Sequence, residues 1–145
     1  MNTKRQLPLL IALLVGGCDD SISGPSGTDT SSTSTTTLIT ESFEATLARG
    51  ESTFYSFSVS AAGPATVTLA SVVQPGKAAA LATPIQIALG TPVGEGCAIT
   101  DSVEASPSLT PQLTATITSG IHCVQVADSG QLTGQVIASI RFVHP

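Results

Sequence analysis

Aromatic and charged side chains are scarce in this sequence. It has no tryptophan, one tyrosine and four phenylalanines, and charged residues make up only 10% of its 145 positions. So few rings argue against a stacking platform for sugars or nucleic-acid bases. Two of the five basic residues are Lys4 and Arg5, and no basic cluster follows them. This excludes a nucleic-acid binder that depends on a basic patch.

Motifs of several enzyme classes are also missing. Gly94 and Gly96 do not precede a helical pattern, so they do not form a phosphate-binding loop. No serine lies in a nucleophile-elbow sequence, although serine and threonine are abundant. The only histidines are His122 and His144. His122 shares a strand face with two valines, which predicts a packed core side chain, and the penultimate His144 is predicted to be solvated.

The first 18 residues have the order of a secretory signal. Two basic residues are followed by an apolar run over residues 7–15 and a glycine pair before Cys18. The run is too short for a membrane-spanning helix, which needs about 20 residues. The stretch Leu14-Val15-Gly16-Gly17-Cys18 resembles the lipobox of bacterial lipoproteins. The resemblance implies cleavage before Cys18, a diacylglyceryl thioether on its sulfur and often an acyl group on its new amino terminus. An ordinary cleaved signal with a chance cysteine is the alternative.

Residues 19–37 are predicted to be a flexible tether. They contain six Ser, six Thr, three Asp and one large apolar residue, so they cannot bury enough surface to offset the entropy of ordering. A coil of 19 residues spans roughly 24 Å. The predicted plan is a signal peptide over 1–17, the lipidated cysteine and linker over 18–37, and a folded domain over 38–145. Two or three acyl chains would hold the protein at the cell membrane or outer membrane, with the domain facing the periplasm or the exterior.

The cysteine count fits an exported protein once Cys18 carries lipid. Cys97 and Cys123 then form an even pair in an oxidising compartment, which predicts a disulfide. The bond would close a loop with 25 residues between its ends and contribute roughly 3.5 kcal/mol in the chain-entropy model. Two free thiols or a metal-binding pair are the alternatives. His122 adjoins Cys123, but neighbouring strand residues point to opposite faces, which argues against one shared zinc ion.

From Leu38 onwards apolar and polar residues alternate, which is the period of a half-buried strand. Such runs begin near Phe43, Tyr55, Ala65, Ile85, Leu113, Ile121 and Val136. Residues 97–99 are predicted to be a short extended piece, 90–96 and 100–111 to be loops, and Ala78–Ala82 to be able to form one helical turn. The pattern predicts an all-β fold, a single antiparallel β-sandwich of seven to eight short strands, jelly-roll or immunoglobulin-like.

Two runs carry a resemblance to a known family. Tyr55-Ser56-Phe57-Ser58-Val59 and Val67-Thr68-Leu69, preceded by Phe43 and Leu47, resemble the opening of bacterial pre-peptidase C-terminal-type domains. Those domains are small β-sandwiches on secreted proteins, which implies the same fold for residues 43–145. Residues 120–128 and 143–145 resemble uncharacterised exported sandwiches of the same general type. Some members bind calcium through clustered acids. The candidates here are Glu95, Asp101, Glu104 and Asp128, all in predicted loops and without an Asp-rich run.

These features together predict a lipid-anchored, non-catalytic binding or structural module of the cell envelope. We expect no cofactor, and we expect the membrane and an envelope protein or ligand as partners rather than nucleic acid. The ten acidic and three basic residues left after cleavage also argue weakly against binding of anionic lipid or nucleic acid. One alternative is a small envelope hydrolase that uses paired loop carboxylates or His122. Another is an assembly subunit that adds an exposed edge strand to a neighbour.

Overall fold

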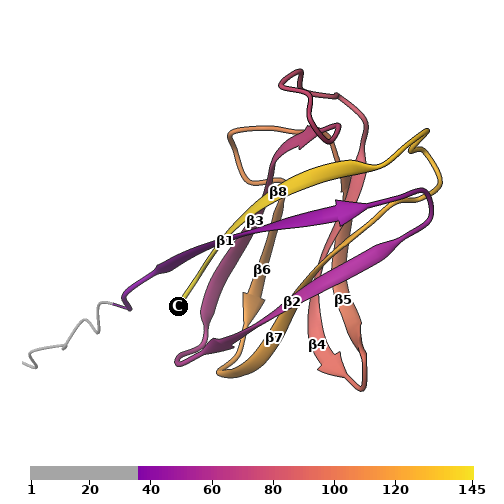
Figure 1. Ribbon diagram of the computed structural model, residues 1–145. Helices are drawn as coiled ribbons and strands as arrows, with labels where there is room; N and C mark the ends of the chain where they lie inside the picture. Colours follow the sequence, from indigo (N-terminus) through magenta and orange to yellow (C-terminus); the bar gives the residue numbers. More distant parts are fainter. Residues whose placement is uncertain (1–35) are drawn as a thin grey trace, which may run out of the picture. The chain divides into compact units, whose positions relative to one another are not determined.

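Eight β-strands run through residues 36–145, the part of the chain that this computed structural model describes (Figure 1). They are β1 (Ile39–Leu47), β2 (Ser52–Val59), β3 (Gly63–Val73), β4 (Ile85–Val93), β5 (Gly96–Ala105), β6 (Leu113–Ile117), β7 (Gly120–Ala127) and β8 (Val136–His144). No helix among these residues is long and apolar enough to cross a membrane. The predicted signal peptide, Cys18 and the linker up to residue 35 lie outside the described residues.

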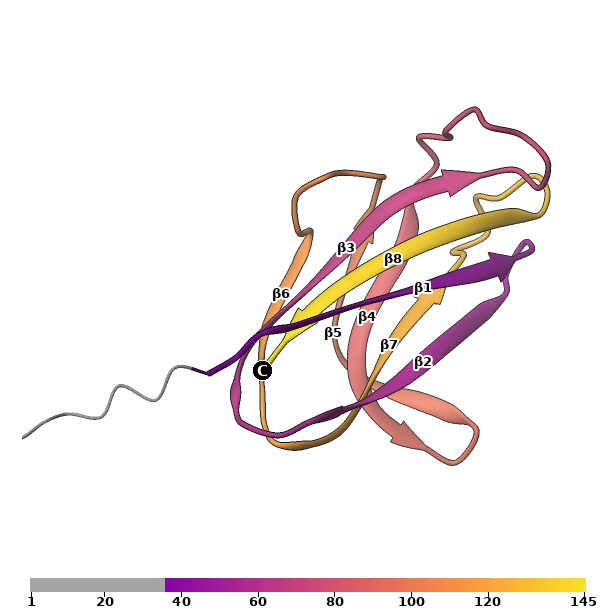
Figure 2. The same ribbon diagram turned by 60° about the vertical axis from the view of Figure 1, so that its left-hand side comes forward.

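The strands pair into two antiparallel sheets, which pack as two layers (Figure 2). Sheet A has the order β1-β8-β3-β6, and sheet B has the order β2-β7-β4-β5. The chain changes sheet at every step except between β4 and β5, which form a hairpin. This connectivity is that of a jelly roll. The predicted β-sandwich is therefore confirmed, and of its two predicted forms the jelly roll is the one that occurs.

The apolar residues of the alternating runs meet between the two sheets. Leu47, Val67 and Phe142 from sheet A and Ile87 and Val124 from sheet B are each at most 1% exposed. Successive side chains of a strand point to opposite faces, so the intervening Ser and Thr residues face outwards. Full burial of one such apolar side chain contributes about 1.5–3 kcal/mol. The contact between the layers is therefore the main source of stability.

The prediction of loops at 90–96 and 100–111 was wrong over much of their length, where the chain forms strands. β4 and β5 form one long hairpin that turns at Gly94, where φ is 58°. β5 is one of the two edge strands of sheet B, and its residues Asp101, Ser102 and Glu104 are exposed. An edge strand carries polar residues on both faces because they discourage pairing with another chain. Such a strand lacks the alternation by which the other strands were predicted.

The helical turn considered for Ala78–Ala82 does not form. Ala80 instead makes an isolated antiparallel bridge with Val73 of β3, and the Leu81 amide donates to the Val72 carbonyl at 2.7 Å. A single helical turn fixes several residues for one hydrogen bond, which is unfavourable. The edge of β3 offers the same segment ready-made partners, so it is extended.

Candidate functional site

A groove of about 470 Å³ lies on the outer face of sheet A. We call it the outer groove, and it is lined by Ser42, Phe43, Glu44, Ala70, Ser108, Leu109, Ser139, Ile140 and Arg141. Its volume falls in the range of small-molecule sites, which is about 300–1,000 Å³. No histidine or cysteine is among these lining residues.

Strand register places the floor of the outer groove. Arg141 of β8 pairs with Ser42 of β1 on one side and Thr68 of β3 on the other. Ser139, two residues earlier, pairs with Glu44 and with Ser71. Paired residues of neighbouring strands share a face, so these side chains form two adjacent rows.

A β-bulge between Leu69 and Ser71 adds a further feature to the floor. It leaves Ala70 without a partner on β8, and Ala70 is exposed in the groove. A bulge bends its strand locally. The floor of the outer groove is therefore a bent surface of small side chains crossed by one guanidinium and one carboxylate.

The wall of the outer groove is the connection between β5 and β6. Its residue Gln112 holds it to β3, because the Gln112 side chain accepts from the Leu69 amide at 2.9 Å and donates towards the Leu69 carbonyl at 3.4 Å. The Ser108 amide also donates to the Leu69 carbonyl at 2.9 Å. These bonds extend the ladder of β3 beyond the end of β6. They fix the loop so that Leu109, 88% exposed, stands at the rim.

Within the described residues, the two charged side chains of the outer groove make few hydrogen bonds. The Arg141 guanidinium donates to the Leu109 carbonyl at 3.2 Å, and an arginine has five N–H donors. Glu44 accepts from the Ser139 hydroxyl at 3.4 Å. Within residues 36–145 neither side chain forms an ion pair. The groove therefore presents a cation and an anion that still have capacity for a ligand.

A second pocket, of about 270 Å³, lies between β4, β5 and β6 and contains His122. Its lining is Leu89, Gly90, Thr91, Thr100, Asp101, Thr116, Ile117, Thr118 and His122, which unites two of the sequence candidates, Asp101 and His122. His122 is 8% exposed, and its Nε2 lies 2.8 Å from the Thr118 carbonyl. A carbonyl oxygen only accepts hydrogen bonds, so Nε2 carries the proton of this contact.

The four weak calcium candidates are not brought together. Glu95 is exposed in the β4–β5 turn, Asp101 lies in the His122 pocket, and Glu104 accepts from the Ser129 hydroxyl. Over residues 36–145 no three His, Cys, Asp or Glu side chains are close enough to hold a metal ion. Calcium takes six to eight oxygen ligands, and these four carboxylates do not lie together to supply them jointly.

Asp128, the fourth candidate, is 7% exposed, and its carboxylate binds backbone amides of two turns. Its Oδ2 accepts from the Gly50 amide at 2.8 Å, and its Oδ1 accepts from the amides of Gln131 and Leu132 at 2.9 and 3.0 Å. Burial raises the pKa of this carboxyl group, but the backbone N–H groups bonded to it lower the pKa by a larger amount. The resulting pKa is below its ordinary value. Asp128 is therefore a structural anion.

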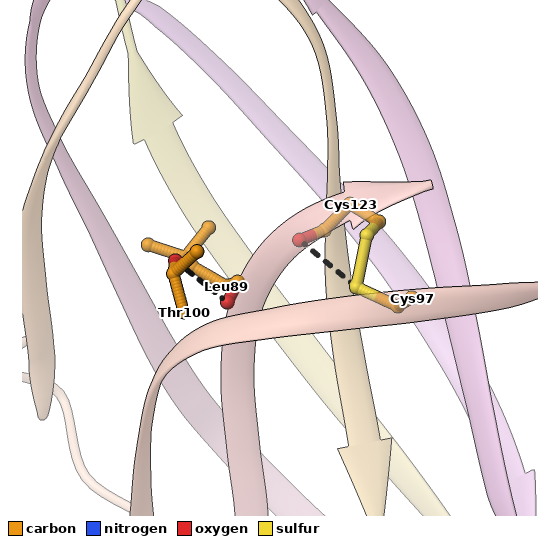
Figure 3. Close-up of a disulfide and its surroundings, with 4 residues drawn as sticks. All are labelled: Leu89, Cys97, Thr100 and Cys123. Carbon is orange, nitrogen blue, oxygen red and sulfur yellow. Dashed lines mark hydrogen bonds between the residues drawn. A yellow bond between two sulfur atoms is a disulfide. The ribbon is translucent and has the colours of Figure 1, made fainter. Parts of the chain in front are cut away.

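Cys97 of β5 and Cys123 of β7 form the predicted disulfide (Figure 3). The two strands flank β4, so in a flat sheet they would lie about 9.6 Å apart, twice the strand spacing. The Cα atoms of the two cysteines are only 6.1 Å apart. Sheet B must therefore fold sharply here. β4 pairs with β7 only as far as Gly90, and the remainder of the β4–β5 hairpin runs on beyond that pairing.

His144 was predicted to be solvated, which is wrong, because it is 1% exposed at the end of β8. Its ring packs against Phe57 and Phe142, with centroids 4.8 and 5.7 Å away. Its Nε2 lies 3.1 Å from Glu41 Oε1, and the other oxygen of Glu41 accepts from the Tyr55 hydroxyl at 3.0 Å. Local sequence patterns could not predict this contact, because Glu41 and His144 are 103 residues apart.

No family model matches this chain, and no curated protein matches it at a significant level.

Sequence reasoning singled out Asp101 and His122 but missed the outer groove. A signal was present in the outward positions of two strands. Glu44 alternates with Ser42 and Thr46, and Arg141 lies two residues after Ser139, in a chain with only 10% charged residues. Only the pairing of β1 with β8 shows that the two charges share one surface.

Proposed function

We propose that this chain is a lipid-anchored, non-catalytic binding module of the cell envelope, and that the outer groove is its ligand site. The observation that carries the binding role is the pair of incompletely satisfied charges, Arg141 and Glu44, in a groove of small-molecule size. Binding residues are commonly held on a rigid scaffold. The docked β5–β6 loop and the sheet floor provide one here.

The anchored location is supported by two features. The stretch ending at Cys18 resembles a lipobox, and a disulfide is typical of proteins that leave the reducing cytosol. The groove lining holds no histidine or cysteine, which are the most frequent general base and a frequent nucleophile in enzymes, and this supports binding over catalysis at that place.

Mass spectrometry of the protein purified from a bacterial envelope tests the anchor. We expect an amino terminus at Cys18 with a diacylglyceryl group, and we expect Cys18→Ala to move the protein out of the membrane fraction. The matched control is Cys97→Ala/Cys123→Ala, which should remain acylated. An unmodified Cys18 thiol in the mature protein would contradict the proposal.

The His122 pocket supports a second candidate, a small hydrolase. It places His122, Asp101 and threonine hydroxyls around one space, which are residue types that general base and nucleophilic catalysis use. A screen of ester, peptide and glycoside substrates tests it with the His122→Ala and Asp101→Asn variants. Activity that both changes abolish would favour the hydrolase over the binding module.

Edge-strand assembly has less support. β5 is a free edge of sheet B, but it carries Asp101 and Glu104 and a bulge at Thr100, features that protect edges from pairing. Sizing of the purified protein over a range of concentrations tests assembly, and a monomer throughout is the expected result.

A further inference from the structure

We propose that the outer groove binds a carbohydrate that bears a carboxylate, of the uronic acid class. This inference rests on the proposed binding function and names the ligand chemistry of that same site. It follows from the combination of one guanidinium, one carboxylate, several hydroxyl groups and one exposed leucine around a single groove.

The guanidinium of Arg141 defines the charge of the ligand. Only one of its bonds, to the Leu109 carbonyl, is made within the described residues. A guanidinium binds a carboxylate through two parallel hydrogen bonds, a geometry that its planar fork matches. The chain has a formal net charge of −5, so its overall charge does not attract anions. Binding of an anion in the groove would therefore depend on Arg141 itself.

The carboxylate of Glu44 favours a ligand that carries a single negative charge and hydroxyl groups. It lies in the row of Ser139, next to the row of Arg141 on the same face of sheet A. A phosphate monoester carries a charge of about −1.5 to −2 at neutral pH and would be repelled more strongly by this carboxylate. A sugar hydroxyl can instead donate a hydrogen bond to it.

The remaining lining suits the ring of a sugar. Ser42 and Ser139 project from neighbouring strands in adjacent rows, as a diagonal pair about 7–8 Å apart, so each can bond a different hydroxyl group of one sugar. Leu109 offers an apolar surface at the rim, against which the C–H face of a sugar can lie. No aromatic platform is needed when an ion pair supplies orientation.

Ligand-observed saturation-transfer NMR tests the proposal with the protein as purified from the envelope, and with detergent micelles alone as the blank. The probes are D-glucuronate, D-glucose, acetate and inorganic phosphate, which separate the carboxylate from the hydroxyl contribution. We expect D-glucuronate to bind at least tenfold more tightly than each of the others. Arg141→Met should reduce its affinity about tenfold or more, and Arg141→Lys should restore part of the loss.

Arg49→Met is the matched control, because Arg49 is an exposed cation in the β1–β2 turn, outside the groove. It should leave D-glucuronate binding unchanged. Equal binding of acetate or phosphate, equal binding of D-glucose, or binding insensitive to Arg141→Met would each overturn the inference. So would the absence of D-glucuronate binding. A different small molecule whose binding is lost in Arg141→Met would overturn the ligand class while supporting the binding function, and an acylated Cys18 would support the anchor in either case.

Discussion

Gly90 of β4 lies directly against the backbone of Ala98 of β5. A Cβ atom built on Gly90 would be 2.7 Å from the Ala98 carbonyl carbon and closer still to its oxygen. The register of β4 and β5 shifts at this point, and the Thr100 hydroxyl donates to the Leu89 carbonyl at 3.2 Å, as Figure 3 shows. The close approach allows β5 to fold towards β7, so that Cys97 reaches Cys123.

We therefore expect Gly90→Ala to lower the free energy of unfolding by about 1–3 kcal/mol, the usual cost of forcing extra atoms into a packed region. Chemical denaturation under oxidising conditions measures the change. Gly134→Ala is the control, because a Cβ at Gly134 meets nothing within 4 Å. Equal losses in the two variants would show that Gly90 is not constrained by Ala98.

The disulfide should hold the outer part of the β4–β5 hairpin as well as the whole fold. Loss of a native disulfide typically costs about 2–5 kcal/mol, and we expect Cys97→Ala/Cys123→Ala to fall in that range. Hydrogen exchange should rise most at residues 91–98, which lie beyond the pairing of β4 with β7. A uniform rise over all strands would contradict a local role for the bond.

Asp128 should make the protein sensitive to acid. The folded state lowers the pKa of its carboxyl group, so its contribution is complete above the ordinary value of 3.8 and is lost as the pH falls through the lower folded pKa. We expect Asp128→Asn to be less stable than the parent at pH 7 and to lose less stability on acidification. Thermal unfolding from pH 7 to pH 2 provides the comparison. Parallel curves for the two proteins would show that another group dominates.

Tyr55 should titrate late in alkali. Its hydrogen bond to Glu41 is the largest cause that raises the pKa of the phenol above 10.0, and the charge of Glu41 adds to the effect. A raised pKa means that this contribution to stability is complete below pH 10 and is lost as the pH rises through the folded pKa. Tyr55 is the only tyrosine, so tyrosinate absorbance reports on it alone. Glu41→Gln should move the pKa down towards 10, and an unchanged titration would refute the coupling.

Local alternation was sufficient to predict most of the strands, because residues such as Val67 and Ile87 bury one face of each strand. It failed for β5, whose Asp101 and Glu104 are exposed at an edge. It also failed for the outer groove and for His144, for a different reason. Glu44 and Ser139 are 95 residues apart, and Glu41 and His144 are 103 apart, so the register of β1 with β8 decides both contacts. Register was not contained in the pattern of any single strand.

The wall of the outer groove depends on Gln112 in the same long-range way. Gln112→Ala would leave the Leu69 amide without its side-chain partner in a partly buried position, at a cost of about 1–3 kcal/mol. The β5–β6 loop should then exchange hydrogen faster, and the apparent affinity of the groove ligand should fall although Arg141 is still present. Gln135→Ala, at an exposed position, is the control and should stay within about 0.5 kcal/mol of the parent. Gln112→Ala could instead loosen the loop without lowering the affinity for the groove ligand. The wall would then contribute nothing to binding, and Arg141 and the sheet floor alone would account for it.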